Sequence, residues 1–200
     1  FLILLNLNSF SQNTNEIKWD SDNYDSVFLK LDFVSHILIN KSLSSEIYVK
    51  YKREGELKEN ILLKTNGNNR ELYIQEKVSP ILKRYNDKLS VHKTVASEIE
   101  ILVPIDFKTI IKAKFCSIDL MASFSNINLE IDEGDINLNQ KKIKGEIKSI
   151  SANVFCINQE VKLLVSSKIG LVSGLYNSST EPDLKVKTIR GNITNECSIN

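Results

Sequence analysis

Apolar and polar residues alternate along most of the chain in short runs. In the second half, four such runs cover Ile111–Leu120, Leu129–Leu138, Leu163–Leu171 and Leu184–Ile193. In each run, apolar and polar residues alternate first. A small or polar residue follows, and after it comes an apolar-x-apolar pair or the beginning of one. Alternation with a period of two predicts strands that have one face in a core and the other in water. We therefore expect the second half to consist of short stacked strands.

The first half shows the same alternation less regularly. Strands are predicted at Glu16–Trp19, Val27–Leu31, Ile37–Ile39, Glu46–Lys52, Asn60–Lys64, Glu71–Gln75 and Ser97–Val103. The run Asn66–Asn69 predicts a hairpin or corner, because Asn and Gly tolerate positive φ. Ser79-Pro80 interrupts the pattern, and Lys83–Leu89 is expected to be a loop or one helical turn. Since no apolar stripe with helical spacing is long enough for a helix, the fold class is predicted to be all-β.

The spacing of the runs favours a β-solenoid. Aligning Ile118-x-Leu120, Ile136-x-Leu138, Phe155-x-Ile157 and Ile169-x-Leu171 gives intervals of 18, 19 and 14 residues. Coils of about 20 residues can stack on one another and bury a continuous core. Corners need compact residues or positive φ, and the residues placed to supply them are Gly134, Gly145, Asn153, Gly170 and Gly191. A β-sandwich is the alternative, since its short strands also recur at close intervals.

Length and composition fit one folded domain. The 200 residues are 42% hydrophobic and 26% charged, as in ordinary folded proteins. Residues 12–200 are predicted to form a single domain, with a less regular part at 12–104 and the repeat region at 105–200. The net charge of +1 gives no strong field for nucleic acid or an anionic membrane.

The first residues resemble the end of a secretory signal peptide. Phe1–Phe10 is apolar but too short to span a bilayer, and no later segment is apolar enough to do so. Ser9 and Ser11 place small residues at −3 and −1 of a cleavage site before Gln12. Residues 1–11 are therefore expected to be a signal-peptide remnant, and the protein to be exported to the periplasm, cell surface or medium. An edge strand is the alternative for this segment.

The cysteines do not suggest a metal or redox site. Cys116, Cys156 and Cys197 lack C-x-x-C spacing. We expect Cys116 and Cys156 to be small apolar residues of the core wall, with a disulfide or a reactive thiol as the alternatives.

Several segments resemble a family of bacterial proteins known as putative adhesins. They are Asp87–Ala96, the strand Glu98–Pro104 (EIEILVP), Ile111–Leu120 (IKAKFCSIDL), Ile127–Leu138 (INLEIDEGDINL) and Lys144–Val154 (KGEIKSISANV). The resemblance covers the chain from about Trp19 to Ile193. It implies an exported protein with a right-handed parallel β-helix-like fold, and many members are domains of unknown function. Cys116 and Ser167 stand where the family commonly has glycine, which implies less regular coils.

Four groups of residues could carry chemistry. Asp132, Glu133 and Asp135 surround Gly134 and would suit a polysaccharide-cleaving enzyme or Ca²⁺, but an exposed acidic corner is expected. The basic run Lys141, Lys142 and Lys144 is expected to be an exposed corner opposite the acidic one, with polyanion binding as the alternative. His36 and His92 lack metal-ligand spacing, and Ser166-Ser167 lacks the flanks of a nucleophile elbow.

Aromatic and amide side chains offer a binding surface instead. Tyr48, Tyr51, Tyr73 and Tyr85 could stack on sugars, although cross-strand packing is the more common use of strand tyrosines. A polar strand face could be formed by Asn126, Asn128, Asn137 and Asn139, unless these are a structural asparagine ladder. The sequon Asn192–Thr194 is expected by chance.

The sequence predicts no catalytic residue, no cofactor and no metal site. The expected function is non-enzymatic binding or scaffolding at the cell envelope, with a glycan or an envelope protein as partner and no nucleic acid. A β-helix enzyme acting on polysaccharide and a self-assembling envelope module are the alternatives.

Overall fold

The computed structural model describes residues 13–54, 61–68, 70–78, 96–140, 142–157, 161–174 and 181–196. Its 15 strands form one mixed sheet, and the one helical element in these ranges is a 3-10 turn at Ser21–Asn23. The all-β prediction is confirmed. The proposed signal-peptide remnant at residues 1–11 and the predicted loop at Lys83–Leu89 lie outside the described residues.

The strands are β1 (Asn13–Asp20), β2 (Ser26–Leu31), β3 (His36–Lys41), β4 (Glu46–Glu54), β5 (Ile61–Asn68), β6 (Glu71–Val78), β7 (Ala96–Val103), β8 (Lys108–Leu120), β9 (Phe124–Leu138), β10 (Ile143–Ser149), β11 (Asn153–Ile157), β12 (Leu163–Ser167), β13 (Val172–Gly174), β14 (Leu184–Thr188) and β15 (Ile193–Glu196). All seven strands predicted in the first half are present, with bounds shifted by a few residues.

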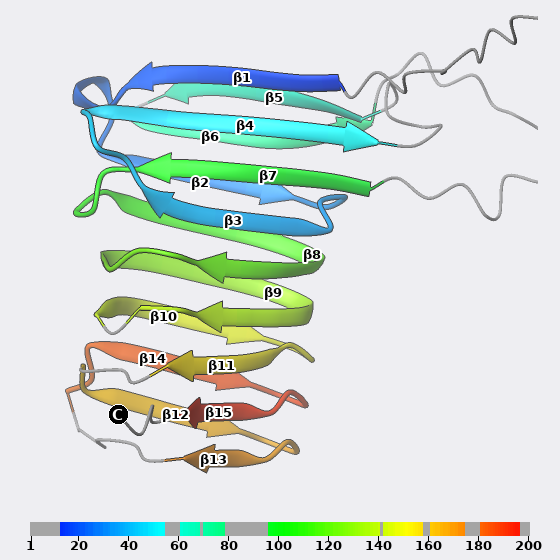
Figure 1. Ribbon diagram of the computed structural model, residues 1–200, viewed down its shortest axis with the longest axis vertical. Helices are drawn as coiled ribbons and strands as arrows, with labels where there is room; N and C mark the ends of the chain where they lie inside the picture. Colours follow the sequence, from blue (N-terminus) through cyan, green and yellow to red (C-terminus); the bar gives the residue numbers. More distant parts are fainter. Residues whose placement is uncertain are drawn as a thin grey trace, which may run out of the picture.

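The sheet folds back on itself so that two ladders of strands enclose one core (Figure 1). The back ladder runs β5-β6-β2-β8-β9-β10-β14-β12, and the front ladder runs β1-β4-β7-β3-β8-β9-β11-β15-β13. Strands β8 and β9 belong to both, because each bends midway. In β8, Ile111 pairs with Leu29 of β2 in the back ladder, whereas Ile118 pairs with Ile37 of β3 in the front ladder.

Gly134 forms the bend of β9, as the sequence predicted. Its φ is 134°, and a Cβ atom there would lie 1.9 Å from the backbone oxygen of Cys116. Glycine is therefore required both by the backbone conformation and by the close approach of β8. Gly145 was also predicted as a corner but lies inside β10, where the register against β9 shifts between Ile143 and Gly145. It lies beside a bulge in β9, which has one residue more than β10 at this point, rather than at a corner.

The repeat alignment is correct for two layers and wrong after them. Ile118 pairs with Ile136, and Ile136 pairs with Val154, so the core spacing is 18 residues at both steps. The predicted position Phe155 is one residue out of register and 38% exposed. Ile169 is 70% exposed. A slip of one residue turns every side chain of a strand to the opposite face.

The layers of the sheet do not follow chain order at either end. In the back ladder, β14 lies between β10 and β12, and in the front ladder, β15 lies between β11 and β13. Both β14 and β15 nevertheless come after these strands in the sequence. At the other end, β2 and β3 lie between β8 and the later strands β6 and β7. The prediction that each coil stacks on its sequence neighbour therefore fails at both ends, where apolar alternation alone does not select a strand's neighbour.

The predicted hairpin at Asn66–Asn69 exists, but its turn comes later. Asn66 and Gly67 lie within β5, and Asn68 pairs with Glu71 of β6. Arg70 adopts the positive φ, at 60°. The loop is thus the two-residue connection between Asn68 and Glu71, and Gly67 pairs with Leu72 inside the ladder.

The core lies between the two ladders and is built from inward-facing Ile, Leu and Val side chains. Cys116 and Cys156 are free and buried in it, as predicted. Burial raises the pKa of each thiol to about 12, so neither is a reactive thiolate at neutral pH. Cys197 lies outside the described residues.

Candidate functional site

A groove of about 580 Å³ opens on the outer face of the front ladder, over β1, β4 and β7. Strict alternation in β4 explains its position. Ile47, Val49 and Tyr51 are fully buried, so Tyr48 between them points outward into the groove. The groove lining includes Glu16, Lys18, Asn40, Glu46, Tyr48 and Glu100.

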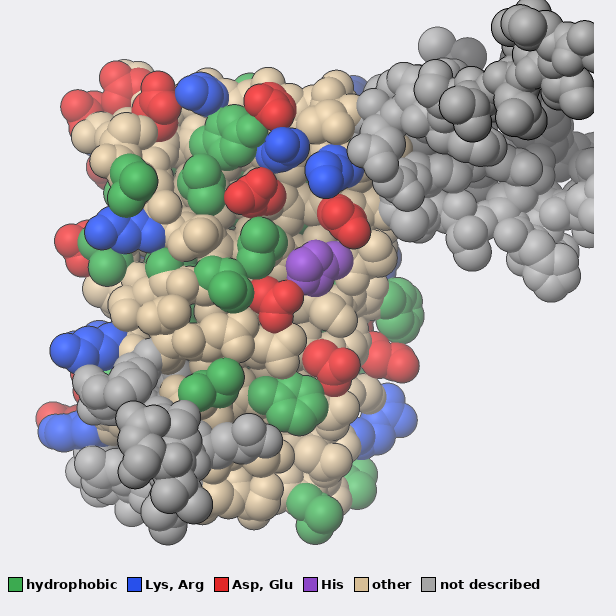
Figure 2. Space-filling model, viewed as in Figure 1, with side chains coloured by type: hydrophobic (Ala, Val, Ile, Leu, Met, Phe, Trp, Pro, Cys, Tyr) green, Lys and Arg blue, Asp and Glu red, His purple; other side chains and the backbone are tan. Residues whose placement is uncertain are grey.

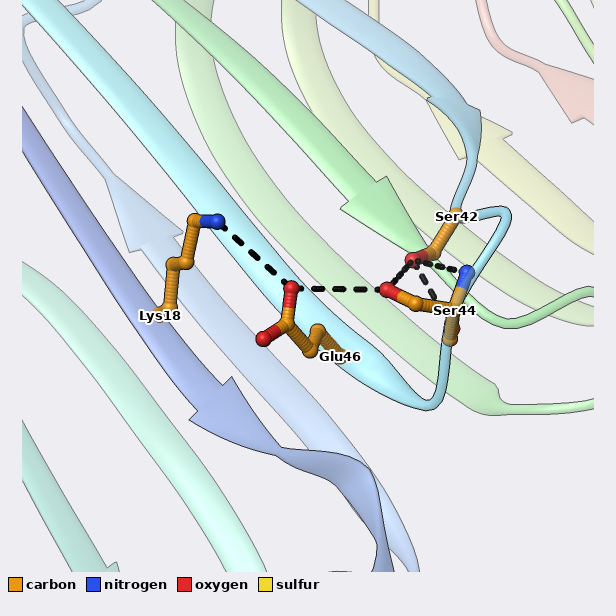
Figure 3. Close-up of polar contacts among 4 residues, drawn as sticks. All are labelled: Lys18, Ser42, Ser44 and Glu46. Carbon is orange, nitrogen blue, oxygen red and sulfur yellow. Dashed lines mark hydrogen bonds and ion pairs between the residues drawn. The ribbon is translucent and has the colours of Figure 1, made fainter.

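One wall of the groove is the loop between β3 and β4, which is held by serine hydrogen bonds (Figure 3). The Ser42 hydroxyl donates to the Ser44 carbonyl over 2.9 Å, and the Ser42 amide donates to the Val103 carbonyl over 2.8 Å. The Ser44 hydroxyl donates to Glu46 Oε2 over 3.4 Å. Glu46 Oε2 also lies 3.6 Å from Lys18 Nζ. The loop and the strands beside it therefore present hydroxyl, carboxylate and ammonium groups to the same space.

Tyr48 is the aromatic group of the groove. Lys18 Nζ lies 5.8 Å from the centre of its ring, within the range of a cation–π contact. Loss of solvent around the phenol and the carboxylate of Glu16, to which the phenol donates a hydrogen bond, raise the pKa of Tyr48. Lys50 Nζ in turn lies 3.4 Å from Glu16 Oε1. The ring is held in place by charged neighbours while part of it stays exposed.

A smaller hollow of about 170 Å³ adjoins the groove on the same face and is lined by His36, Leu38, Lys50, Glu98 and Glu100. Glu100 lines both hollows. Figure 2 shows this face, on which acidic, basic and hydrophobic side chains are interspersed. Together the two hollows form a track of charged and apolar side chains that crosses several strands.

A hydrogen-bonded chain continues this track along the ladder. His36 Nε2 lies 2.7 Å from Asp119 Oδ2, and Asn137 Nδ2 donates to Asp119 Oδ1 over 2.7 Å. Partial burial opposes ionisation of Asp119, but the hydrogen bonds from His36 and Asn137 outweigh it and lower the pKa of Asp119. This carboxylate is therefore ionised near neutral pH, and its two oxygens are already occupied by partners.

The predicted asparagine face is not a single surface. Asn128 pairs with Ile110 and Glu146 in the back ladder, whereas Asn137 pairs with Asp119 in the front ladder. The bend at Gly134 separates them. Asn137 donates to Asp119 of β8, and Asn139 donates to Met121 Sδ directly after β8. These are contacts between layers, but their acceptors are Asp and Met rather than the asparagines of an asparagine ladder.

The predicted acidic cluster is a bend. Asp135 Oδ1 accepts from Asn153 Nδ2 over 3.1 Å, and the Asp132 carbonyl accepts from the Ser151 amide. Glu133 is exposed and pairs with Phe115 across the bend. Within the described ranges, no group of three or more His, Cys, Asp or Glu residues is arranged to hold a metal ion.

The other predicted candidates are dispersed. Lys144 Nζ lies 3.1 Å from Asp183 Oδ1. The Ser167 hydroxyl donates to the Gly191 carbonyl, and Asn192 Oδ1 accepts from the Leu171 amide. Tyr73 stacks on Phe28 of the neighbouring strand with ring centres 5.0 Å apart, the cross-strand packing expected of a strand tyrosine. Lys141, His92 and Tyr85 lie outside the described residues.

Sequence reasoning missed a buried carboxylate. Glu76 is 2% exposed, and it accepts hydrogen bonds from the Tyr51 phenol over 2.5 Å and the Phe33 amide over 2.7 Å. Burial raises the pKa of Glu76, although these hydrogen bonds partly oppose the rise. The signal was present, because alternation in β6 places Glu76 on the same face as Leu72 and Ile74.

Comparison with known proteins adds a likeness of fold. No family model and no curated protein matches the chain. A crystal structure named as a putative cell adhesion protein from Clostridium sporogenes matches with a TM-score of 0.57 and 14% identity, over 94% of this chain and 100% of that one. Putative adhesins from Bacteroides fragilis and Parabacteroides merdae match at 12% identity with TM-scores of 0.39 and 0.37, covering 93% and 94% of this chain and 98% and 97% of theirs.

The likeness of fold therefore rests on the clostridial structure. At 14% identity it concerns the fold alone. Within the described ranges, no helix is long and apolar enough to cross a bilayer.

Proposed function

We propose that this protein is an exported, non-enzymatic binding module of the cell envelope, and that its groove around Tyr48 binds a glycan. The observation that carries the proposal is the outward-facing Tyr48 ring in a groove of about 580 Å³ lined by carboxylate, amide, hydroxyl and ammonium groups. Binding sites for small molecules commonly combine an apolar or aromatic surface with a few polar groups that fix orientation.

Each lining group has a role in sugar recognition. The Tyr48 ring offers an apolar face to the C–H side of a pyranose, and the ring loses little conformational entropy when it binds. The carboxylates of Glu16, Glu46 and Glu100 accept hydrogen bonds from sugar hydroxyls, which are stronger than bonds between neutral groups. Because carboxylates outnumber lysines in the groove, we expect it to prefer neutral sugars or amino sugars over acidic ones.

The adhesin-like part of the proposal has separate support. The clostridial structure of similar fold is named as a putative cell adhesion protein. The parallel stacking of β2 and β3 on β8, of β8 on β9, and of β9 on β10 and β11 supports a solenoid-like arrangement with irregular ends. A right hand is expected for parallel crossovers. Export, with residues 1–11 as the remnant of a signal peptide and residues 12–200 as one mature domain, completes the proposal.

A glycan array followed by calorimetry tests it. The purified chain is screened against neutral, amino and acidic oligosaccharides, and the best ligand is titrated into wild type, Tyr48→Ala and Tyr73→Ala. We expect Tyr48→Ala to weaken binding by about tenfold or more, since a buried aromatic contact contributes about 1–3 kcal/mol. Tyr73→Ala, in the back ladder, is expected to bind like wild type. An array without any bound glycan, or an equal loss in both variants, would reject the groove.

Two further readouts separate binding from the other parts of the proposal. Chromatography of the oligosaccharide after long incubation is expected to show unchanged chain length, whereas shortened products would indicate an enzyme. N-terminal sequencing of the protein from its native cells is expected to begin at Gln12, and a cytosolic protein that begins at Phe1 would reject export.

A further inference from the structure

The outer face of the back ladder carries a straight row of lysines across its strands. Strand register places Lys64 of β5 opposite Gln75 of β6. On the next strands the row continues with Lys30 of β2, Lys112 of β8, Glu130 of β9, Lys148 of β10 and Lys187 of β14. We call Lys64, Lys30, Lys112, Lys148 and Lys187 the lysine row. Their strand neighbours along the chain, such as Leu29, Ile111 and Ile147, are buried, so the lysines point outward.

The row carries more positive than negative charge. Lys112 Nζ lies 2.6 Å from Glu130 Oε2, and Lys148 Nζ lies 2.8 Å from Glu146 Oε2. Among the described residues, Lys64, Lys30 and Lys187 form no ion pair. Lys185 adds a further positive charge, and both Lys187 and Lys185 interact electrostatically with Glu146. These two neighbouring lines of side chains therefore hold six lysines against two carboxylates.

The front ladder has the opposite balance. Among the residues whose side chains are described, its outer face carries eight carboxylates against four lysines: Glu16, Asp20, Glu46, Glu98, Glu100, Asp119, Glu133 and Asp135 against Lys18, Lys41, Lys50 and Lys52. The net charge of +1 therefore conceals a molecule with one basic and one acidic face. The contiguous basic run at Lys142 and Lys144 is not the main basic feature.

We propose that the lysine row binds a linear polycarboxylate polysaccharide, a polyuronate, laid across the strands. Neighbouring strands are roughly 4.8 Å apart, which is close to the length of one sugar ring in an extended chain. Carboxylates spaced one to a ring therefore come into register with the lysines, and Gln75 and Glu130 interrupt the row at two strands. Several weak contacts of this kind add to a specific attachment, because the polymer is held at many points.

The chemistry of the row favours a polyuronate over a nucleic acid. Single-stranded nucleic acids bind where aromatic side chains stack on successive bases. The row itself consists of Lys, Gln and Glu side chains. Phe28 and Tyr73 lie on the neighbouring line, but they stack on each other with ring centres 5.0 Å apart, so they form no series of rings spaced along the row. The proposal is independent of the groove at Tyr48, which lies on the other ladder and is expected to reject acidic sugars.

Calorimetric titration of the full chain with a decamer of galacturonic acid tests the lysine row. A neutral maltodextrin of similar length serves as the comparison ligand. We expect binding of the galacturonate alone, with an affinity that falls linearly with salt concentration on logarithmic axes. Lys30→Gln with Lys187→Gln is expected to weaken binding by about tenfold and to flatten the salt dependence.

The matched control is Lys50→Gln with Lys52→Gln, which removes the same charge from the front ladder and is expected to bind galacturonate like wild type. Lys30→Arg with Lys187→Arg is expected to retain the affinity, and circular dichroism checks the fold of each variant. The proposal is overturned by absent galacturonate binding, or by an equal loss in the control. Equal or tighter binding of a single-stranded oligonucleotide of the same charge, or binding to anionic vesicles alone, would also overturn it.

Discussion

Tyr51 of the front ladder donates a hydrogen bond to Glu76 of the back ladder across the core, over 2.5 Å. Both side chains are buried, with exposed fractions of 0% and 2%. The second oxygen of Glu76 accepts from the Phe33 amide in the corner between β2 and β3. One buried carboxylate thus links β4, β6 and this corner, at the end of the sheet that carries the groove.

Replacing Tyr51 by Phe should destabilise the protein by about 1–3 kcal/mol, because the buried carboxylate loses a donor and no water replaces it. Urea denaturation followed by circular dichroism measures the free energy of unfolding. Tyr73→Phe is the matched control, since Tyr73 stacks on Phe28 at a partly exposed position and should change the free energy by less than about 0.5 kcal/mol. Equal losses in both variants would contradict a structural role for the bond.

Glu76 should also make stability depend on pH. Its pKa in the folded state is raised above its ordinary value of 4.5, so the folded chain holds this proton more tightly than the unfolded chain. The contribution of Glu76 is therefore fully favourable below pH 4.5 and is lost as pH rises through the folded-state pKa. The lowered pKa of Asp119 acts in the opposite direction, because its stabilising contribution is lost as pH falls.

The variant Glu76→Gln isolates this contribution, because it leaves Asp119 unchanged. Unfolding free energies of wild type and variant should be measured between pH 4 and pH 7. We expect the advantage of wild type over the variant to shrink as pH rises. Parallel curves would show that Glu76 has no shifted pKa.

Gly134→Ala should cost at least about 2 kcal/mol, because it combines a strained positive φ with a clash against the Cys116 carbonyl. Gly67→Ala is the control. A Cβ there would meet the Tyr24 ring at 3.1 Å, and Gly67 has no positive φ. We expect this variant to lie within about 1 kcal/mol of wild type, since alanine also restricts the unfolded chain. Thermal unfolding measures the stability of both variants. A loss for Gly134→Ala no larger than that for Gly67→Ala would show that the bend does not require glycine.

The order of the last layers can be tested with two isoleucines. Ile193 is fully buried between Val154 and Val172, so Ile193→Ala should cost about 2–5 kcal/mol. Ile169, which the sequence alignment placed in the core, is 70% exposed, and Ile169→Ala should cost less than about 0.5 kcal/mol. Urea midpoints of the two variants measure the difference. A larger destabilisation by Ile169→Ala than by Ile193→Ala would instead support layers that stack in chain order.

The sequence predicted the strands well because alternation is a local property. Glu46–Lys52 and Ser97–Val103 lie within β4 and β7, and Gly134 marks a real bend. The choice of neighbours could not be predicted, because strands such as β12 and β14 present similar alternating faces and differ only in long-range packing. At β11, both Val154-x-Cys156 and Phe155-x-Ile157 are apolar pairs, so the alternation left the register undecided.

The candidate site was predictable only in part. Tyr48 was one of four tyrosines that could stack on sugars, with cross-strand packing as the more common use. The groove also needs Lys18 and Glu46, which meet because β1 pairs with β4. The lysine row could not be found as a motif, since its members come from different strands and are collected by register alone. The net charge of the chain was misleading as well, because it sums the charges of two faces of opposite sign.

Mapping a bound glycan onto the two faces of the protein tests whether the groove at Tyr48 is the binding site. Backbone amide signals of isotope-labelled protein should be followed by NMR during titration with the oligosaccharide selected on the array. We expect shifts concentrated at Tyr48, Glu100 and their neighbours in β1, β4 and β7, with β2, β6 and β10 unchanged. Shifts confined to the back ladder, or none at saturating glycan, would contradict the groove as the binding site.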